Sequence, residues 1–193
     1  MRVFGNPGGV FRQTIRFEHR EIDQMCVDAL KAASLLPSDP SPIRIDRFIE
    51  KHFSSRVAYE DVDAGVLGCT VFEPSGKIKV VMVSPALADG TTVGRRRERS
   101  TLAHEAGHCL MHPTLFMDDG TQTVFTGTCH ENLDFKQRKI LCRDDDFRRN
   151  GRKYDGRWWE YQANRAIGGY HVYGELRLGL RITAADDLRS ARQ

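Results

Sequence analysis

The chain has 193 residues, of which 40% are hydrophobic and 28% are charged, and its formal net charge at neutral pH is +3. This composition is that of an ordinary globular chain, and it excludes a membrane-spanning protein because no segment approaches the ~18 apolar residues of a membrane helix. The five cysteines are odd in number and widely spaced, and residues 1–7 carry no signal-like apolar run. We therefore expect a single domain over residues 1–193, located in the cytoplasm with reduced thiols.

The first part of the chain is predicted to be helical after a loose start. Residues 1–16 contain several glycines and are expected to be loose. Apolar residues recur at helical spacing over residues 17–36, and Pro37 ends that pattern. Ser41-Pro42 is typical of an N-cap and a first helical residue, and predicts a second helix whose apolar face extends to Phe53. No convincing DNA-reading pair of helices is present, so core packing is the simpler interpretation.

Three β-rich stretches follow, at residues 56–62, 66–73 and 77–83. The last two flank Pro74-Ser75-Gly76, which is typical of a hairpin turn. The predicted fold class is therefore α+β, with a small antiparallel or mixed sheet packed on helices. Residues 81–83 are expected to form an edge to which an extended peptide can add, although a covered core strand would give the same pattern.

The strongest functional signal is His104-Glu105-Ala106-Gly107-His108, within residues 101–111 that favour a helix ending before Pro113. Residues four apart share a helix face, so both imidazoles can bind one metal ion with Glu105 beside them. Zinc binds imidazole readily, and a neighbouring carboxylate can accept a proton from the water that it activates. The motif therefore predicts a zinc hydrolase, most often a peptidase. The alternative is a half-buried helix whose histidines only bridge carbonyl groups.

His112 continues the histidine row but is not expected to bind the same ion. Eight residues rise about 12 Å along a helix, which is too far for His104 and His112 to share a metal with bonds near 2 Å. We expect His112 either to contact the ligands or to be solvated. The third ligand must then come from downstream, where the candidates are His130, Cys129, Cys142, the acidic run 144–146 and Glu160.

Glu160 lies in a predicted helix over residues 158–167, before the glycines at 168 and 169. It shares a face with Asn164, and the small Ala163 allows another helix to approach closely. Such a packing would complete a site of two histidines and one glutamate. From spacing alone, an exposed charge beside two tryptophans is equally consistent.

The remaining segments carry weaker signals. Residues 113–155 are expected to be a long loop region, with a short strand at 123–128, that acts as a functional flap or a surface segment. A capping-box pattern at residues 183–186 predicts a short final helix. The arginine run 95–97 is read as a solvated surface more readily than as a contact with an acidic partner. Direct nucleic-acid binding is not expected, because no recognition-helix or zinc-finger signature accompanies it.

Two segments resemble the ImmA/IrrE family of metallopeptidases. Residues 99–108 are similar to the family's Arg-x-Thr-Leu-Ala-His-Glu-x-Gly-His stretch, and residues 160–164 to its later glutamate followed by two residues and Ala-Asn. The resemblance covers roughly residues 42–167. After Asn164 the chain departs from the usual Phe-Ala continuation, and the stretch between the two motifs is longer than the family usually has.

This resemblance implies a zincin-like metallopeptidase core with His104, His108 and Glu160 as Zn2+ ligands and Glu105 as general base. It also implies a protein partner, a DNA-binding repressor of the helix-turn-helix type, cleaved in bacterial or phage and mobile-element gene control. The alternative is a non-hydrolytic, metal-stabilised regulator that binds a repressor or nucleic acid. The side chains considered for contacting the ligands or the oxyanion are His112, Tyr154, Tyr161, Asn164, Arg157 and His130.

Overall fold

The computed structural model describes residues 1–6, 8–11, 13–38, 41–117, 132–144 and 156–176, and their side chains as far as Tyr170. Four α-helices are present in these ranges: α1 (His19–Ala32), α2 (Ile45–Phe53), α3 (Thr92–Met111) and α5 (Trp158–Leu176). The strands are β1 (Arg2–Gly5), β2 (Gln13–Arg16), β3 (Arg56–Tyr59), β4 (Val66–Phe72), β5 (Ile78–Val83), β6 (Leu133–Asp134) and β7 (Lys139–Arg143). Two 3-10 turns, η1 (Pro85–Leu87) and η2 (Pro113–Phe116), flank α3.

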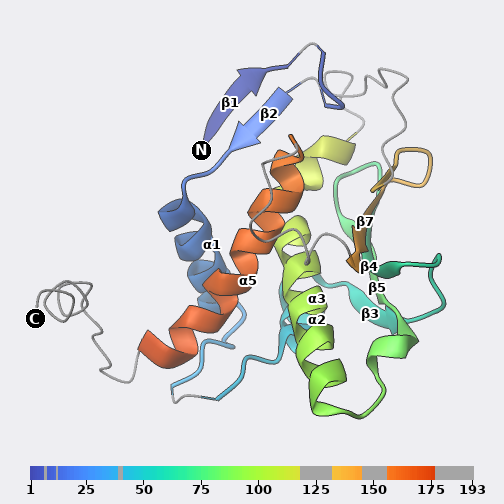
Figure 1. The fold of residues 1–193 in the computed structure, drawn as a ribbon. Helices are drawn as coiled ribbons and strands as arrows, with labels where there is room; N and C mark the ends of the chain where they lie inside the picture. Colours follow the sequence, from blue (N-terminus) through green and yellow to red (C-terminus); the bar gives the residue numbers. More distant parts are fainter. Residues whose placement is uncertain (7, 12, 39–40, 118–131, 145–155, 177–193) are drawn as a thin grey trace, which may run out of the picture.

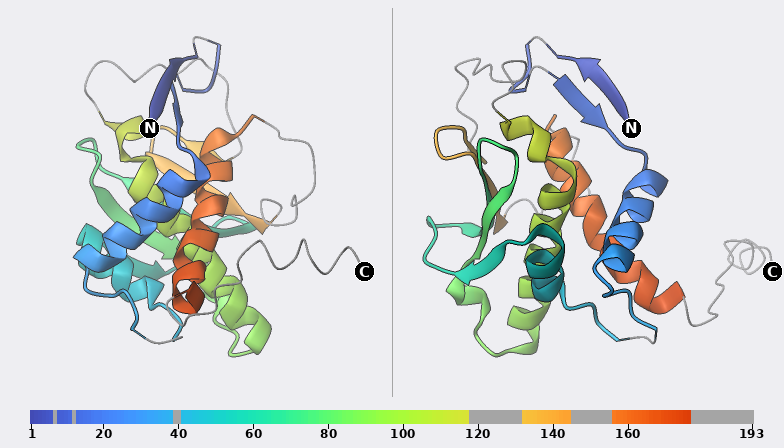
Figure 2. Two further views of the ribbon diagram at one scale, coloured as in Figure 1. Left: turned by 90° about the vertical axis from the view of Figure 1, so that its left-hand side faces the viewer. Right: turned by 180° about the vertical axis from the view of Figure 1, so that it is seen from behind.

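Five strands form one mixed sheet in the order β3-β5-β4-β7-β6, in which only β3 and β5 run parallel. Helix α3 lies between this sheet and α5, and α1 packs on the outer side of α5 (Figure 1). Seen from behind, α2 lies against α3 (Figure 2). This arrangement confirms the predicted mixed sheet packed on helices. Within the described ranges no helix is long and apolar enough to cross a bilayer.

The predicted hairpin between β4 and β5 is present, but the predicted sheet edge is wrong. Gly76 adopts φ +81° in the turn, a conformation that favours glycine. Strand β5 is flanked by β3 on one side and β4 on the other, with Val81 opposite both Val57 and Thr70. Val81 and Val83 are fully buried. Strand β3 itself pairs with β5 and covers its edge, a non-local pairing that the local pattern cannot indicate.

The first sixteen residues, expected to be loose, instead contain an antiparallel hairpin of β1 and β2, with Arg2 opposite Arg16. We call it the N-terminal hairpin; it lies beside the end of α5 where that helix begins (Figure 1). Phe11 anchors it, because its buried ring makes edge contacts with Phe116 and with Trp158 and Trp159. Tertiary contacts, rather than local propensity, hold these short strands.

The segment 113–155, predicted to be one long loop region, contains η2, β6 and β7 in its described part. Strand β7 pairs along most of β4 and so becomes part of the central sheet. The strand predicted at 123–128 and the helix predicted at 183–186 lie outside the described residues. Helix α5 also runs further than predicted, because the glycines at 168 and 169 continue it rather than end it.

Helices α3 and α5 cross closely because small residues face each other. A Cβ atom on Gly107 would lie 2.9 Å from the Cβ of Ala166 and 3.1 Å from the Cα of Ala163. This agrees with the expectation that the small Ala163 allows another helix to approach closely. The close crossing brings residues 104–108 of α3 near Glu160 of α5. The spacing between the helices is therefore set by Gly107 and Ala163.

We expect Gly107→Ala to lower the free energy of unfolding by about 1–3 kcal/mol, because the added methyl overpacks a contact made by helix backbone. Gly168→Ala in α5 is the matched control. Its Cβ would meet only the end of the long Arg165 side chain, at 2.9 Å, rather than helix backbone, and alanine favours a helix by up to ~1 kcal/mol over glycine. Urea denaturation of both variants checks this, and equal stabilities would show that the crossing is not tight.

Candidate metal centre

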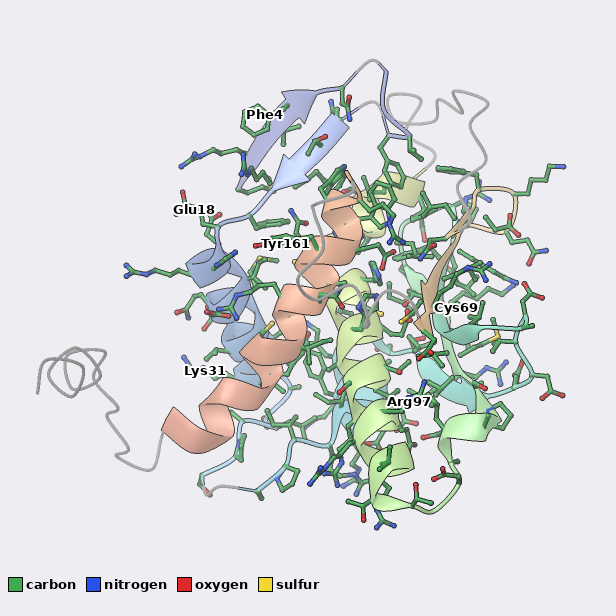
Figure 3. All side chains as sticks on the ribbon, in the orientation of Figure 1. Phe4, Glu18, Lys31, Cys69, Arg97 and Tyr161 are labelled. Carbon is green, nitrogen blue, oxygen red and sulfur yellow. The ribbon has the colours of Figure 1, made fainter. Side chains whose placement is uncertain are left out.

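The two histidines of the motif lie on successive turns of α3 and point at one position. Their Nε2 atoms are 2.9 Å apart, and both side chains are fully buried. Helix α3 begins earlier than predicted, at Thr92, where the Thr91 hydroxyl caps it by accepting a hydrogen bond from the Gly94 amide at 2.9 Å. The arginine run therefore lies in the first turns of α3, where Figure 3 labels Arg97, and Arg97 pairs with Asp144 at 2.5 Å.

Glu160, from the first turn of α5, completes a group of three side chains. Its carboxylate lies 3.2 Å from Nε2 of His104 and 3.8 Å from Nε2 of His108. A tetrahedral zinc with bonds near 2.0–2.1 Å separates neighbouring ligand atoms by about 3.3 Å. The three separations bracket that value, so the donor set fits zinc. We call His104, His108 and Glu160 the metal centre.

The environment of Glu160 excludes an exposed charge. The residue is 4% exposed, and neither carboxylate oxygen accepts a hydrogen bond from the described residues. Burial alone would raise the pKa of Glu160, but the His108 and His104 rings bring it below its usual value. A buried, ionised carboxylate that faces two imidazoles is what a cation between them would compensate.

The outer nitrogen of each ligand ring has a defined partner. Nδ1 of His104 lies 3.0 Å from Oδ1 of Asn164, which can only accept, so the ring carries its proton on Nδ1 and presents a lone pair at Nε2. Such outer contacts orient metal-binding rings and fix their tautomers. Asn164 was expected to share the face of Glu160, and the structure places it in this contact.

His112 belongs to a hydrogen-bond chain that starts at the metal centre. Its Nδ1 lies 3.0 Å from Nδ1 of His108, and its Nε2 lies 3.1 Å from Oε1 of Gln162. The amide of Gln162 donates to the carbonyl oxygen of Ile15 at 2.7 Å. Because that carbonyl only accepts, every proton in the chain is assigned: His108 donates to His112, which donates to Gln162. Burial lowers the pKa of His112 to about 3, so the ring stays neutral, as this chain requires.

We expect His112→Phe and Gln162→Leu each to weaken zinc binding roughly 10–100-fold, since both remove the orientation of the His108 ring. Competition with a chromophoric chelator measures this, with His52→Phe in α2 as a control histidine away from the centre. His52 stacks on Phe48 and contacts none of the ligands. Unchanged zinc affinity in both variants would show that the chain does not support the ligand.

Glu105 lies beside the metal centre, fully buried, and one of its oxygens is held by strand β4. The Thr70 hydroxyl donates to Oε2 of Glu105 at 2.6 Å. Helix α3 approaches β4 this closely because Gly68 has no side chain: a Cβ there would lie 2.8 Å from Cγ2 of Thr101 and 3.1 Å from Oε1 of Glu105. Neither Thr70 nor Gln162 was singled out from the sequence. In strand β4 only the alternation of side chains hints that Thr70 faces the helix.

Thr70→Val should lower the free energy of unfolding by about 1.5–3 kcal/mol, the contribution of a buried hydrogen bond to a charged group. Thr70→Ser retains the hydroxyl and serves as the matched variant. Chemical denaturation in the presence of a chelator separates this effect from metal binding. If both variants lose the same stability, packing and not the hydrogen bond is responsible.

Other predicted site residues do not join the centre. The Tyr161 hydroxyl lies 2.7 Å from Nε2 of His19 on α1, and the side chain is 50% exposed (Figure 3). Arg157 is buried just before α5. Tyr154, His130 and Cys129 lie outside the described residues. A cavity of about 560 Å³ opens instead between the N-terminal hairpin and α5, lined in part by Phe4, Tyr161 and Gln162.

Comparison of the chain with known protein families, with curated proteins and with solved structures finds no match. What the protein does must therefore be inferred from the metal centre and its surroundings.

Proposed function

We propose that the protein is a zinc-dependent peptidase in which His104, His108 and Glu160 hold the metal and Glu105 is the general base. The observation that carries this proposal is the convergence of three buried donor atoms, 2.9 to 3.8 Å apart, with a carboxylate beside them. Three protein ligands plus one further position are the usual arrangement of a catalytic zinc. The similarity of residues 99–108 and 160–164 to ImmA/IrrE metallopeptidases supports the same reading.

The side chains around the metal centre each have a role in this mechanism. When bound, zinc supplies Lewis acidity that polarises a peptide carbonyl and acidifies water. Glu105 accepts the proton of the attacking water and passes it to the leaving amine. Thr70 orients the Glu105 carboxylate by its 2.6 Å hydrogen bond. Asn164 and His112 hold the two ligand rings in the tautomer that binds a metal.

For the substrate we propose a helix-turn-helix repressor, which the family resemblance supports. The test is to incubate the zinc-loaded protein with helix-turn-helix repressors from its own genome, beginning with any encoded near its gene, and to identify fragments by mass spectrometry. Cleavage that a chelator stops and zinc restores is the expected result. A generic protease substrate is a poor reporter, because such enzymes can be selective. Intact repressor with a fully loaded protein would contradict the proposal for this partner.

We further propose that the protein acts in the cytoplasm. Four free cysteines are buried in the described part of the chain: Cys26, Cys69, Cys109 and Cys142. Unpaired thiols of this number are typical of a reducing compartment. The second candidate function, a non-hydrolytic metal-stabilised regulator, is favoured by burial, because His104, His108 and Glu105 are all fully enclosed.

A further inference from the structure

Strand β7 brings a thiol to the metal centre. Cys142 lies opposite Gly68 of β4, and directly opposed residues of an antiparallel pair project from the same face of the sheet. That face is the one where Gly68 approaches Thr101 and Glu105 of α3. The Cys142 side chain is therefore directed at the motif helix, and it is fully buried.

The sulfur lies close to both the ligand His104 and the base Glu105. One donor atom from each of Cys142, His104 and Glu105 lies within 4.8 Å of the other two, as do the donors of the metal centre itself. Electrostatic interaction couples the two groups, since, against the effects of burial, Cys142 acts to raise the pKa of His104 and His104 acts to lower that of Cys142. Since Asn164 contacts Nδ1 of that ring, we place the thiol on the Nε2 side, where the metal centre lies.

Two further observations indicate a ligand position rather than a bystander thiol. The Glu160 carboxylate is buried, has no hydrogen bond from the described residues and faces His104, the ring that Cys142 also approaches. In addition, the register of β4 against β7 shifts between Val66 and Gly68, next to Cys142. Such irregularities re-aim side chains beside functional sites.

We propose that Cys142 becomes the fourth ligand of the metal when zinc binds, which would give a latent, closed form of the peptidase. This inference rests on the proposed zinc site. Within 4.8 Å, Cys142 shares only His104 with the metal centre, so its sulfur would have to turn toward His108 and Glu160 to take the fourth position, which the reacting water otherwise needs. Ligation breaks the S–H bond, forms the sulfur–metal bond and releases one proton to solvent. Release of the sulfur would leave that position to solvent and activate the enzyme.

Cobalt substitution tests the ligand directly. Metal-free protein titrated with Co2+ should show a thiolate-to-cobalt charge-transfer band in the near ultraviolet, and Cys142→Ala and Cys142→Ser should both lose it. Cys69→Ala is the matched control. That buried cysteine is on β4 but faces the opposite side of the sheet, packed with Ala58, Val71 and Val80 (Figure 3). Since loss of outer contacts costs roughly 10–100-fold in metal affinity, loss of this ligand should weaken zinc binding at least ~100-fold.

The outcomes separate this inference from the proposed function. Stoichiometric cobalt binding without the charge-transfer band in the unaltered protein overturns the inference and leaves the zinc site intact. No binding of zinc or cobalt overturns the proposed function itself. The spectrum of the unaltered protein decides the question even if the variants fold poorly, which circular dichroism would reveal. With a cleavable repressor, and at a zinc concentration that saturates both proteins, Cys142→Ser should act faster than the unaltered protein, and an equal or slower rate overturns the latency.

Discussion

Glu105→Gln is expected to abolish peptide hydrolysis while the protein still binds zinc. The amide keeps the size of the side chain and can still pair with Thr70, which donates to Oε2 of Glu105 at 2.6 Å. It cannot accept a proton from water, and general-base catalysis typically contributes about 10²–10⁴-fold. Metal content by mass spectrometry and the rate of repressor cleavage are the two measurements.

The control for this variant is Glu98→Gln, the same change on the same helix. Glu98 accepts a hydrogen bond from the Tyr59 hydroxyl near the surface and is remote from the metal centre in sequence by nearly two turns. The Glu98→Gln variant should cleave the repressor at the normal rate. Normal cleavage by Glu105→Gln would remove Glu105 from its role. A retained regulatory effect in cells, without cleavage, would favour the non-hydrolytic regulator.

Glu160→Ala is expected to abolish tight zinc binding. It removes one of three metal-binding side chains, so the affinity for zinc should fall by at least ~100-fold. Loss of a hydrogen bond to a ligand, in comparison, costs roughly 10–100-fold. A ligand at 100 times its Kd stabilises a protein by about 2.7 kcal/mol, so zinc should raise the Tm of the unaltered protein and not that of the variant. Differential scanning calorimetry with and without zinc measures both.

Without zinc, the same substitution should not raise stability, since, despite burial, the His108 and His104 rings that bring the pKa of Glu160 below its usual value favour the ionised carboxylate in the folded state at neutral pH. Glu50→Ala, at an exposed position of α2, is the control and should retain the zinc-induced rise in Tm. A full zinc response in Glu160→Ala would place the third ligand elsewhere.

The arrangement of the metal motif could be predicted from the sequence because the geometry of a helix depends only on residues close together in the chain. The four-residue spacing of His104 and His108, and the small Ala163 near Glu160, follow from helix geometry alone. The structure brings these residues together as expected, and it gives His112 a contact with a ligand rather than a ligand's place. Asn164 is likewise beside His104.

The short strands could not be predicted in the same way, because strands of four or five residues depend on pairing partners that are distant in sequence. Residues 139–143 become β7 only by pairing with β4, and residues 13–16 become β2 only by pairing with β1. For that reason Cys142 was one candidate among several, and Thr70 was not considered. Residues 81–83 read equally as edge or core until β3 is seen beside them.

The hydrogen-bond chain from His108 ends on a main-chain atom, the carbonyl oxygen of Ile15. Every amino acid carries this group, so substitution of the side chain at position 15 leaves the last hydrogen bond of the chain intact. Displacement of the backbone at this position would break that hydrogen bond. A molecule that separated the N-terminal hairpin from α5 would therefore loosen the His108 ring of the proposed zinc site without contacting any residue of the motif.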